Sequence, residues 1–194
     1  MKYRLILASA SPRRRELLEQ VGAEFEILPA QGKEIIAGRN PRQIVMELSS
    51  QKADEIAEKI EDEQIVILGA DTVVAYEGQI LGKPRDERDA KRMLELLSGN
   101  THSVFTGVTM IIIHKDRKET CSFVEETRVT MYPMKEQQIL SYIRTGEPLD
   151  KAGAYAIQGK CARYIQGIQG DYYNVVGLPL GRIFHEMEQS GIEI

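Results

Sequence analysis

The stretch Ile65-Val66-Ile67-Leu68-Gly69-Ala70-Asp71-Thr72 decides the fold that we expect for this chain. Its first four residues are all aliphatic and predict a buried strand, which ends at the Gly-Ala-Asp-Thr segment. A second run of the same kind, Leu5-Ile6-Leu7-Ala8, lies nearer the N-terminus. Helical patterns alternate with these runs along the chain, and such alternation predicts an α/β fold.

Further elements are expected on both sides of this stretch. Helices are predicted at residues 13–21, 41–60, 86–97, 135–144 and 179–189. Other strands are predicted at 24–28, 73–76 paired with 79–81, 102–114 and 120–132. Residues 146–177 are rich in Gly, Tyr and Gln and predict loops with short strands. No internal repeat interrupts residues 1–194, so we expect one domain, whose two lobes split near residue 100 and face a cleft.

The composition is that of an ordinary globular protein with a mild excess of acidic residues. Of the 194 residues, 42% are hydrophobic, and 25 basic against 29 acidic side chains give a net charge of −4. This balance argues against nucleic-acid binding but allows a small anionic ligand held by a few bases. Two distant cysteines and three histidines argue against a disulfide scaffold and a zinc centre. No apolar run matches a membrane span or a signal-peptide core, so we expect a cytoplasmic protein with no membrane partner.

Lys52 interrupts an apolar stripe. When the predicted helix at 41–60 is laid out at about 100° per residue, Lys52 falls between Leu48 and Ile56, near the centre of the apolar arc. A lysine there breaks the local pattern, and such breaks concentrate at functional sites. The alternative is a packed stem whose ammonium group reaches water.

Asp71 directly follows the predicted strand at residues 65–68 and its Gly-Ala extension. In open α/β sheets, ligands gather at the carboxyl ends of strands. An aspartate there commonly holds Mg²⁺ or activates water. The alternative is a turn aspartate that binds nearby backbone amides.

A cluster of bases opens the first helix, in Ser9-Ala10-Ser11-Pro12-Arg13-Arg14-Arg15. Ser11 is the expected N-cap and Pro12 the expected first helical residue. Free N–H groups and the helix dipole favour phosphate there and disfavour arginine, so three arginines suggest an anionic partner. The alternative is a solvated face whose arginines pair with Glu16 and Glu19.

Two further charged residues complete a possible catalytic set. Lys83 follows a predicted strand in Gly82-Lys83-Pro84, and Glu34 lies in a polar loop. Each is more often a plain surface residue. Together with the Asp71 carboxylate and the basic residues described above, they would suit metal-assisted attack on a phosphoanhydride.

These residues match the motifs of a known family. The sequence resembles the Maf (septum formation inhibitor) nucleotide pyrophosphatases, and the matching motifs occur in the family's order over nearly the whole chain. They are Ser9-Ala10-Ser11-Pro12-Arg13-Arg14, Gly69-Ala70-Asp71-Thr72-Val73-Val74, Gly82-Lys83-Pro84, Leu97-Ser98-Gly99 with His102, Asp150-Lys151-Ala152-Gly153-Ala154-Tyr155 with Ile157-Gln158-Gly159, and Gly170-Asp171-Tyr172 with Val176-Gly177-Leu178-Pro179.

The resemblance implies a reaction and a fold. A nucleoside triphosphate would be cleaved between its α and β phosphorus atoms, giving the monophosphate and pyrophosphate. The fold would be an elongated mixed β-sheet with flanking helices and two lobes around a cleft, similar to the house-cleaning ITPases. The resemblance also implies a divalent metal, Mg²⁺ or Mn²⁺, and a homodimer.

Roles for single residues follow from the same resemblance. Asp71 matches the family's proton acceptor for the attacking water, acting directly or through the metal, and it would also bind the metal. Glu34 matches a carboxylate that helps to hold that metal. The positions that grip the phosphates are Ser9, Arg13, Lys52 and Lys83.

The choice of nucleotide is expected to depend on Arg13, Thr72 and Gln158. These residues resemble the family branch that prefers dTTP and UTP, and the Gln158 amide can both donate to and accept from a pyrimidine edge. The alternatives are another or modified nucleotide, such as 7-methyl-GTP, or a nucleotide-binding regulator of cell division. A set that includes a water-activating carboxylate favours catalysis over binding alone.

Overall fold

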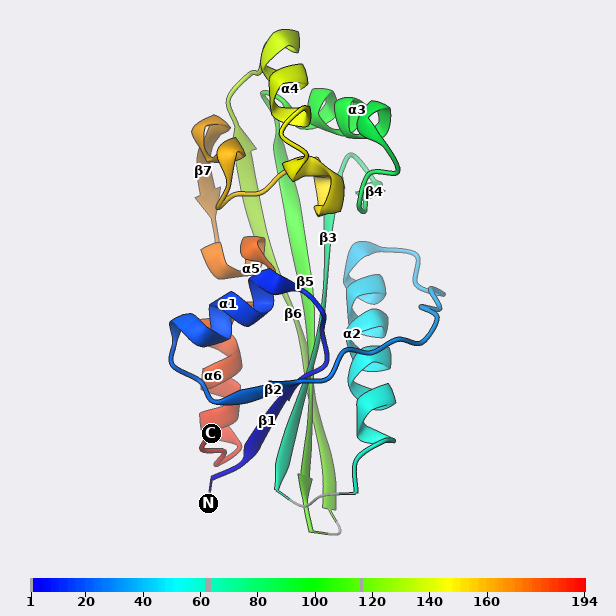
Figure 1. Cartoon of the computed structure of the whole chain (residues 1–194), viewed down its shortest axis with the longest axis vertical. Coiled ribbons are helices and arrows are strands. Elements are labelled where there is room, and N and C mark those ends of the chain that lie inside the picture. Colours follow the sequence, from blue (N-terminus) through cyan, green and yellow to red (C-terminus); the bar gives the residue numbers. More distant parts are fainter. Residues whose placement is uncertain (1, 62–63, 116) are drawn as a thin grey trace. The chain divides into compact units, whose positions relative to one another are not determined.

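The computed structural model describes residues 2–61, 64–115 and 117–194, in which strands and helices alternate as expected (Figure 1). The strands of these residues are β1 (Arg4–Leu7), β2 (Phe25–Ile27), β3 (Ile65–Tyr76), β4 (Gln79–Leu81), β5 (Thr101–His114), β6 (Arg117–Met131) and β7 (Ile165–Gln169). The α-helices are α1 (Pro12–Gln20), α2 (Pro41–Ala57), α3 (Glu87–Leu97), α4 (Glu136–Ile143), α5 (Tyr172–Val176) and α6 (Leu180–Gln189). Three 3₁₀ helices lie between α4 and β7, namely η1 (Glu147–Asp150), η2 (Ala152–Ala154) and η3 (Lys160–Tyr164).

The strands form a seven-stranded mixed sheet. Their order is β2-β1-β3-β5-β6-β7, and β4 pairs with β3 outside this path. β1 runs parallel to both neighbours, so that Leu7 lies opposite Ile27 on one side and Leu68 on the other. β4 and β7 are antiparallel to β3 and β6, respectively. The mixed sheet with its helices confirms the predicted α/β fold.

The chain divides into two compact units, and each is built from separate stretches. The first unit comprises Met1–Asp71, Thr106–Glu125 and Gly177–Ile194, and the second comprises Thr72–Phe105 and Glu126–Val176. Three of the four boundaries fall within β3, β5 and β6, so these three strands contribute to both units. The expectation of one domain over 1–194, with lobes split near residue 100, stays a prediction.

The first unit begins its helices as the sequence predicts. Asn40 caps α2, because its side chain accepts a hydrogen bond of 3.0 Å from the amide of Gln43, and Pro41 is the first helical residue. Ser11 holds the N-cap position of α1 ahead of Pro12, although its side chain makes no capping bond. Figure 1 shows α2 on one side of this unit's strands and α1 and α6 on the other.

Two glycines let α2 approach the sheet closely. A Cβ atom on Gly69 would lie 2.3 Å from the carbonyl oxygen of Ser49, and one on Gly107 would lie 2.2 Å from that of Val45. Real atoms do not approach so closely, so only glycine fits at these positions. The core under α2 consists of Ala53 and Ile56 packed on Ile6, Ala8, Ile65, Ile67 and Ile111.

The strand that carries Asp71 is longer than expected, and the predicted end at Gly69 was wrong. β3 continues from Ile65 through Tyr76, so Asp71 lies within the strand rather than after it. Glycine usually weakens a strand, but here Gly69 marks the place where helix backbone meets strand backbone. The predicted hairpin is confirmed, with Val74 opposite Leu81 across β3 and β4.

Residues near both ends of the sequence meet in the first unit. Lys2 and Glu193 form a parallel β-bridge, and the amide of Tyr3 donates a hydrogen bond of 2.7 Å to the carbonyl of Glu193. α6 lies directly before this bridge and buries Leu180, Ile183 and Met187. Among the described helices, none combines the length and apolar character needed to cross a bilayer.

The second unit contains helices that the sequence pattern did not predict. Residues 146–177 were expected to form loops with short strands, but they also contain η1, η2, η3 and α5. The 3₁₀ helices have three to five residues each, too few to produce a helical repeat in the sequence. Gly146, the N-cap residue of η1, and Gly153, inside η2, adopt positive φ angles of 73° and 67°.

Candidate active site

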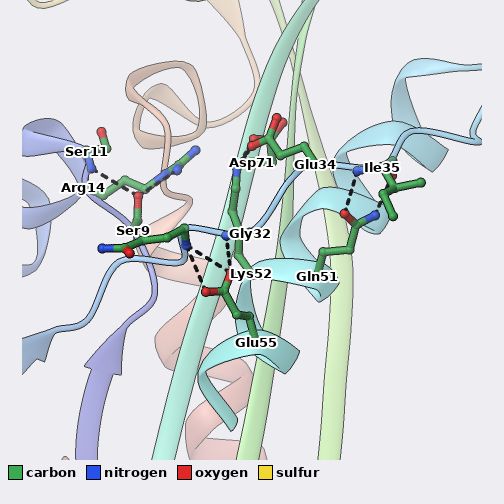
Figure 2. Close-up of polar contacts among 11 residues, drawn as sticks. Ser9, Ser11, Arg14, Gly32, Glu34, Ile35, Gln51, Lys52, Glu55 and Asp71 are labelled. Carbon is green, nitrogen blue, oxygen red and sulfur yellow. Dashed lines mark hydrogen bonds and ion pairs between the residues drawn. The ribbon is translucent and has the colours of Figure 1, made fainter. Parts of the chain in front are cut away.

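Lys52, Asp71 and Glu34 form the centre of the candidate site. The Lys52 ammonium nitrogen lies 2.5 Å from Oδ1 of Asp71 and 3.0 Å from Oε1 of Glu34. The side chains of Lys52 and Asp71 are only 18% and 15% exposed, while that of Glu34 is 51% exposed. Figure 2 shows the three side chains converging from α2, β3 and the loop that precedes α2. One cation therefore joins the two carboxylates that the sequence singled out.

The fold explains why a lysine interrupts the apolar face of α2. Its helical neighbours Leu48 and Ile56 are buried against the sheet, as the stripe predicts. Lys52 shares that face but extends to Asp71, which β3 presents two residues beyond the close approach at Gly69. Its ammonium group thus meets two carboxylates.

A buried arginine forms the second part of the site. Arg14 donates hydrogen bonds to the hydroxyl of Ser9 at 3.1 Å and to the carbonyl of Gly177 at 2.8 Å. Burial lowers the pKa of the Arg14 guanidinium, while the charges of Asp71 and Glu34 act in the opposite direction. Ser9 is also buried and accepts a bond of 3.3 Å from the amide of Ser11. The serine hydroxyl is therefore fixed beside a buried positive charge, an arrangement suited to anionic oxygen.

The three consecutive arginines have different environments. Arg14 is 9% exposed, Arg13 is half-buried, and Arg15 is exposed and pairs with Glu19 at 3.4 Å. Arg15 thus has the solvated, paired arrangement that was the alternative for the whole cluster. The sequence indicated a basic cluster but could not single out Arg14, because its partner Gly177 is 163 positions away.

Three other residues that the sequence predicts for the site, Thr72, Lys83 and Gln158, belong to the second unit. Thr72 is the next residue of β3 after Asp71, and Lys83 and Gln158 are exposed. Within this unit, the amide of Gly153 donates a bond of 3.1 Å to the carbonyl of Gly82. That bond links the segment of Lys83 to the segment that leads to Gln158.

Gln158 lies on a short turn whose two flanks are held by one hydrogen-bonded pair, Tyr142 and Glu147. The amide of Ala156 donates to the hydroxyl of Tyr142 at 3.1 Å, and that hydroxyl donates to Glu147 at 2.7 Å. The same Glu147 carboxylate accepts from the amide of Lys160 at 3.0 Å. Burial raises the pKa of Tyr142, so its hydroxyl stays a donor. No motif or periodicity in the sequence indicated this role of Tyr142 and Glu147.

His102 supports the same segment from β5. Its Nε2 atom lies 2.8 Å from the hydroxyl of Tyr155, and the two rings meet edge to face. Both side chains are buried, and burial lowers the pKa of His102 to about 4. The imidazole is therefore neutral near pH 7 and serves as a packed, hydrogen-bonded group.

The carboxylates at the centre fit a hard divalent cation. Within the described residues, no three His, Cys, Asp or Glu side chains are grouped as a complete metal site. Glu34 and Asp71 supply oxygen ligands, and Mg²⁺ is usually bound by one or two carboxylates together with substrate phosphates. The donor chemistry therefore suits a metal that arrives with a phosphate ligand.

Comparison with solved structures defines the class of fold. A Ham1 protein from Staphylococcus aureus superimposes with a TM-score of 0.51 over 96% of this chain and 99% of its own, at 11% identity. The fold is therefore the mixed α/β class of that protein, as predicted. Residues 4–190 match the family described as Maf-like protein. The chain belongs to the Maf family.

Close relatives extend over the whole length of the chain. A protein from Agathobacter rectalis, named dTTP/UTP pyrophosphatase, is 54% identical over 98% of this chain and 98% of its own. A protein of the same name from Lachnoclostridium phytofermentans is 49% identical over 99% of this chain and 98% of its own. A third, from Bacillus cereus, is 52% identical over 98% and 97% of the two chains.

Proposed function

We propose that this chain hydrolyses dTTP and UTP to the monophosphate and pyrophosphate, as the names of its full-length relatives state for those proteins. The observation that carries the proposal is the position of Lys52 between Asp71 and Glu34. In this arrangement the phosphate-binding cation, Lys52, contacts both the water-activating carboxylate of Asp71 and the metal-binding carboxylate of Glu34. A protein that only bound nucleotide would not need the first of these groups.

Asp71 acts as the proton acceptor in the proposed reaction. It takes a proton from the water that attacks the α-phosphorus, and pyrophosphate departs as the bond to the β-phosphate breaks. Lys52 orients the Asp71 carboxylate before the substrate arrives. It then offsets charge on the phosphate oxygens as that charge increases.

A serine hydroxyl and two basic side chains hold the triphosphate chain. Ser9 and Arg13 at the start of α1, together with Lys83, bind its oxygens, and Arg14 fixes Ser9. Glu34 and Asp71 hold the divalent metal, Mg²⁺ or Mn²⁺, which when bound polarises the phosphate and offsets its charge. These roles are supported by the charges and by the contacts at the centre of the site.

Selection of the base is assigned to Arg13, Thr72 and Gln158. The Gln158 amide offers both a donor and an acceptor to a pyrimidine edge. The resemblance to the family further supports a homodimer, which gel filtration with light scattering tests directly. A cytoplasmic location stays a prediction of the sequence.

The test is pyrophosphate release from a panel of nucleoside triphosphates with Mg²⁺ or Mn²⁺. Wild-type protein should turn over dTTP and UTP in preference to purine nucleotides and 7-methyl-GTP. A preference for purine or methylated nucleotides would keep the reaction but overturn the assignment of Arg13, Thr72 and Gln158. Binding of nucleotides without any turnover would overturn the proposed enzyme and favour a regulator.

A further inference from the structure

The loop that carries Glu34 is mostly exposed. Residues 31–39 form neither helix nor strand, and all of them except Gly38 are exposed. Its two large apolar side chains, Ile35 and Ile36, are 68% and 54% exposed. Burial of apolar surface therefore contributes little to holding this loop, and polar interactions are needed to fix the Glu34 carboxylate 3.0 Å from Lys52.

A row of polar side chains on α2 supplies that interaction. Four residues spaced by four positions lie on one face of the helix, and we call them the acceptor row: Gln43, Glu47, Gln51 and Glu55. Each accepts hydrogen bonds from backbone amides of the loop, in reverse order along the chain. Glu47 binds the amides of Ala37 and Gly38, and Gln43 binds that of Arg39.

The two members of the row nearest Glu34 hold the chain on either side of it. Glu55 accepts bonds of 3.0 and 2.9 Å from the amides of Gln31 and Gly32. Gln51 accepts a bond of 2.9 Å from the amide of Ile35 and donates one of 2.6 Å to the carbonyl of the same residue. Figure 2 shows both anchors, with Glu34 between them and directed toward Asp71.

The row and the site share one helix. Gln51 immediately precedes Lys52, so the residue that fixes the loop and the residue that receives Glu34 are neighbours on α2. The backbone amides of Gln31 and Gly32 and the ammonium group of Lys59 lower the pKa of Glu55 to about 2. Glu55 therefore remains a charged acceptor at every pH at which the protein is assayed.

We propose that Gln51 and Glu55 are positioning residues, which hold the loop so that Glu34 stands beside Lys52 and Asp71. This inference rests on the proposed function, in which Glu34 helps to hold the metal. Gln51 acts through Glu34 and does not itself contact substrate. A displacement of about 1 Å at a reacting group can cost ~10²-fold in rate, so a weak loop anchor has a large effect on turnover.

The first experiment is a double-mutant cycle on dTTP turnover. Gln51→Ala should lower kcat by about tenfold or more, because it releases the peptide next to Glu34. In a Glu34→Gln background the same substitution should have almost no further effect, because the residue through which it acts is already changed. Additive losses in the double variant would overturn the proposal and indicate that Gln51 acts through Lys52 instead.

A second readout does not depend on turnover. Hydrogen exchange should become faster for the amides of residues 31–36 in Gln51→Ala and Glu55→Ala, whereas amides in β3 keep their protection. Mn²⁺ binding in the presence of inorganic pyrophosphate, followed by electron paramagnetic resonance, should weaken in both variants. Glu55→Gln, which keeps an acceptor for Gln31 and Gly32, should restore most of the metal affinity.

Ser50→Ala is the matched control. It also removes one hydrogen bond from α2, that of 2.9 Å to Asp54, but it does not touch the loop. It should leave loop exchange and Mn²⁺ affinity at wild-type values. Unchanged hydrogen exchange and unchanged Mn²⁺ affinity in Gln51→Ala would overturn the positioning role. Turnover of dTTP by the wild-type protein tests the proposed function separately.

Discussion

The Lys52 ammonium nitrogen lies 2.5 Å from Asp71 Oδ1, so an ion pair between residues 19 positions apart joins α2 to β3 within one helical turn of a close backbone contact. The backbone contact is that of Gly69 with Ser49, three residues before Lys52. Because Gly69 lets α2 lie close to β3, the Lys52 side chain is long enough to reach Asp71. Lys52 therefore supplies the positive charge of the site, and Gly69 limits which side chains the strand can carry beneath α2.

Replacing the carboxylate of Asp71 by an amide should separate folding from catalysis. Asp71→Asn keeps the size of the side chain and should preserve the fold. It should lower dTTP turnover by at least ~10²-fold, because an amide cannot accept the proton of the attacking water. Pyrophosphate release and circular dichroism of the same samples check the two expectations. Near-normal turnover would remove Asp71 from the assigned role.

Removing the cation between the carboxylates should also abolish turnover. Lys52→Met keeps an unbranched apolar stem but leaves Asp71 and Glu34 without their common partner, and kcat should fall by ~10²-fold or more. Lys118→Met is a suitable control, because Lys118 also contacts α2, through Asp54 at 3.6 Å, on the exposed surface. The control should match wild type in steady-state kinetics, since exposed pairs contribute little.

The adjacent arginines should respond very differently to the same substitution. Arg14→Ala removes the donor to the buried carbonyl of Gly177 and should lower the free energy of unfolding by about 1–3 kcal/mol, together with kcat. Arg15→Ala loses only an exposed pair with Glu19 and should change stability by less than about 1 kcal/mol. Urea unfolding of both variants measures the difference, and equal effects would contradict the assigned environments.

Adding a methyl group beneath α2 should be costly. Gly69→Ala and Gly107→Ala each force Cβ against a helix carbonyl at 2.3 or 2.2 Å, and each should lower stability by about 3 kcal/mol. Gly181→Ala provides a control of the opposite sign. Nothing lies within 4 Å of its added Cβ, and alanine is favoured over glycine in a helix such as α6, by up to about 1 kcal/mol. Thermal unfolding should therefore shift in opposite directions.

His102 should make stability fall as the solution becomes acidic. Its pKa is lowered from 6.5 to about 4 by burial, so the unfolded chain binds a proton in this range that the folded chain does not. Its contribution is complete above about pH 6.5 and is lost progressively down to about pH 4, by roughly 3 kcal/mol in total. Urea unfolding at pH 7.5 and 4.5 should show a smaller acid loss in His102→Gln than in wild type. An identical loss in both proteins would exclude His102 as the source.

The local capping signals of the helices were readable from the sequence, and so was Lys52. Asn40-Pro41 begins α2 because the Asn40 side chain accepts from the amide of Gln43, three residues on, and the ring of Pro41 fixes a helical φ. Lys52 was visible because a single charge in an apolar stripe contradicts the periodicity around it. In both cases the information lies within one or two helical turns of the residue concerned.

Other features depended on distant partners and could not be predicted. The continuation of β3 past Gly69 depends on how α2 packs against it, which the strand's own sequence does not record. The support of Gln158 by Tyr142 and Glu147 joins residues through loops and short 3₁₀ helices without a periodic pattern. Likewise, Gln51 and Glu55 have the pattern of ordinary polar residues of a helix, because their partners lie 16 to 24 positions away in the loop.

The bridge between Lys2 and Glu193 has a consequence for how the protein is made. Residues 177–194 supply the first unit with α6 and with Glu193, the bridge partner of Lys2. The unit therefore cannot be completed while the ribosome is still adding that stretch. The second unit, by contrast, has all of its residues once Val176 has been synthesised. The nascent chain should therefore acquire its catalytic centre only after synthesis of residues 177–194, and a ribosome stalled within that stretch should display an inactive protein.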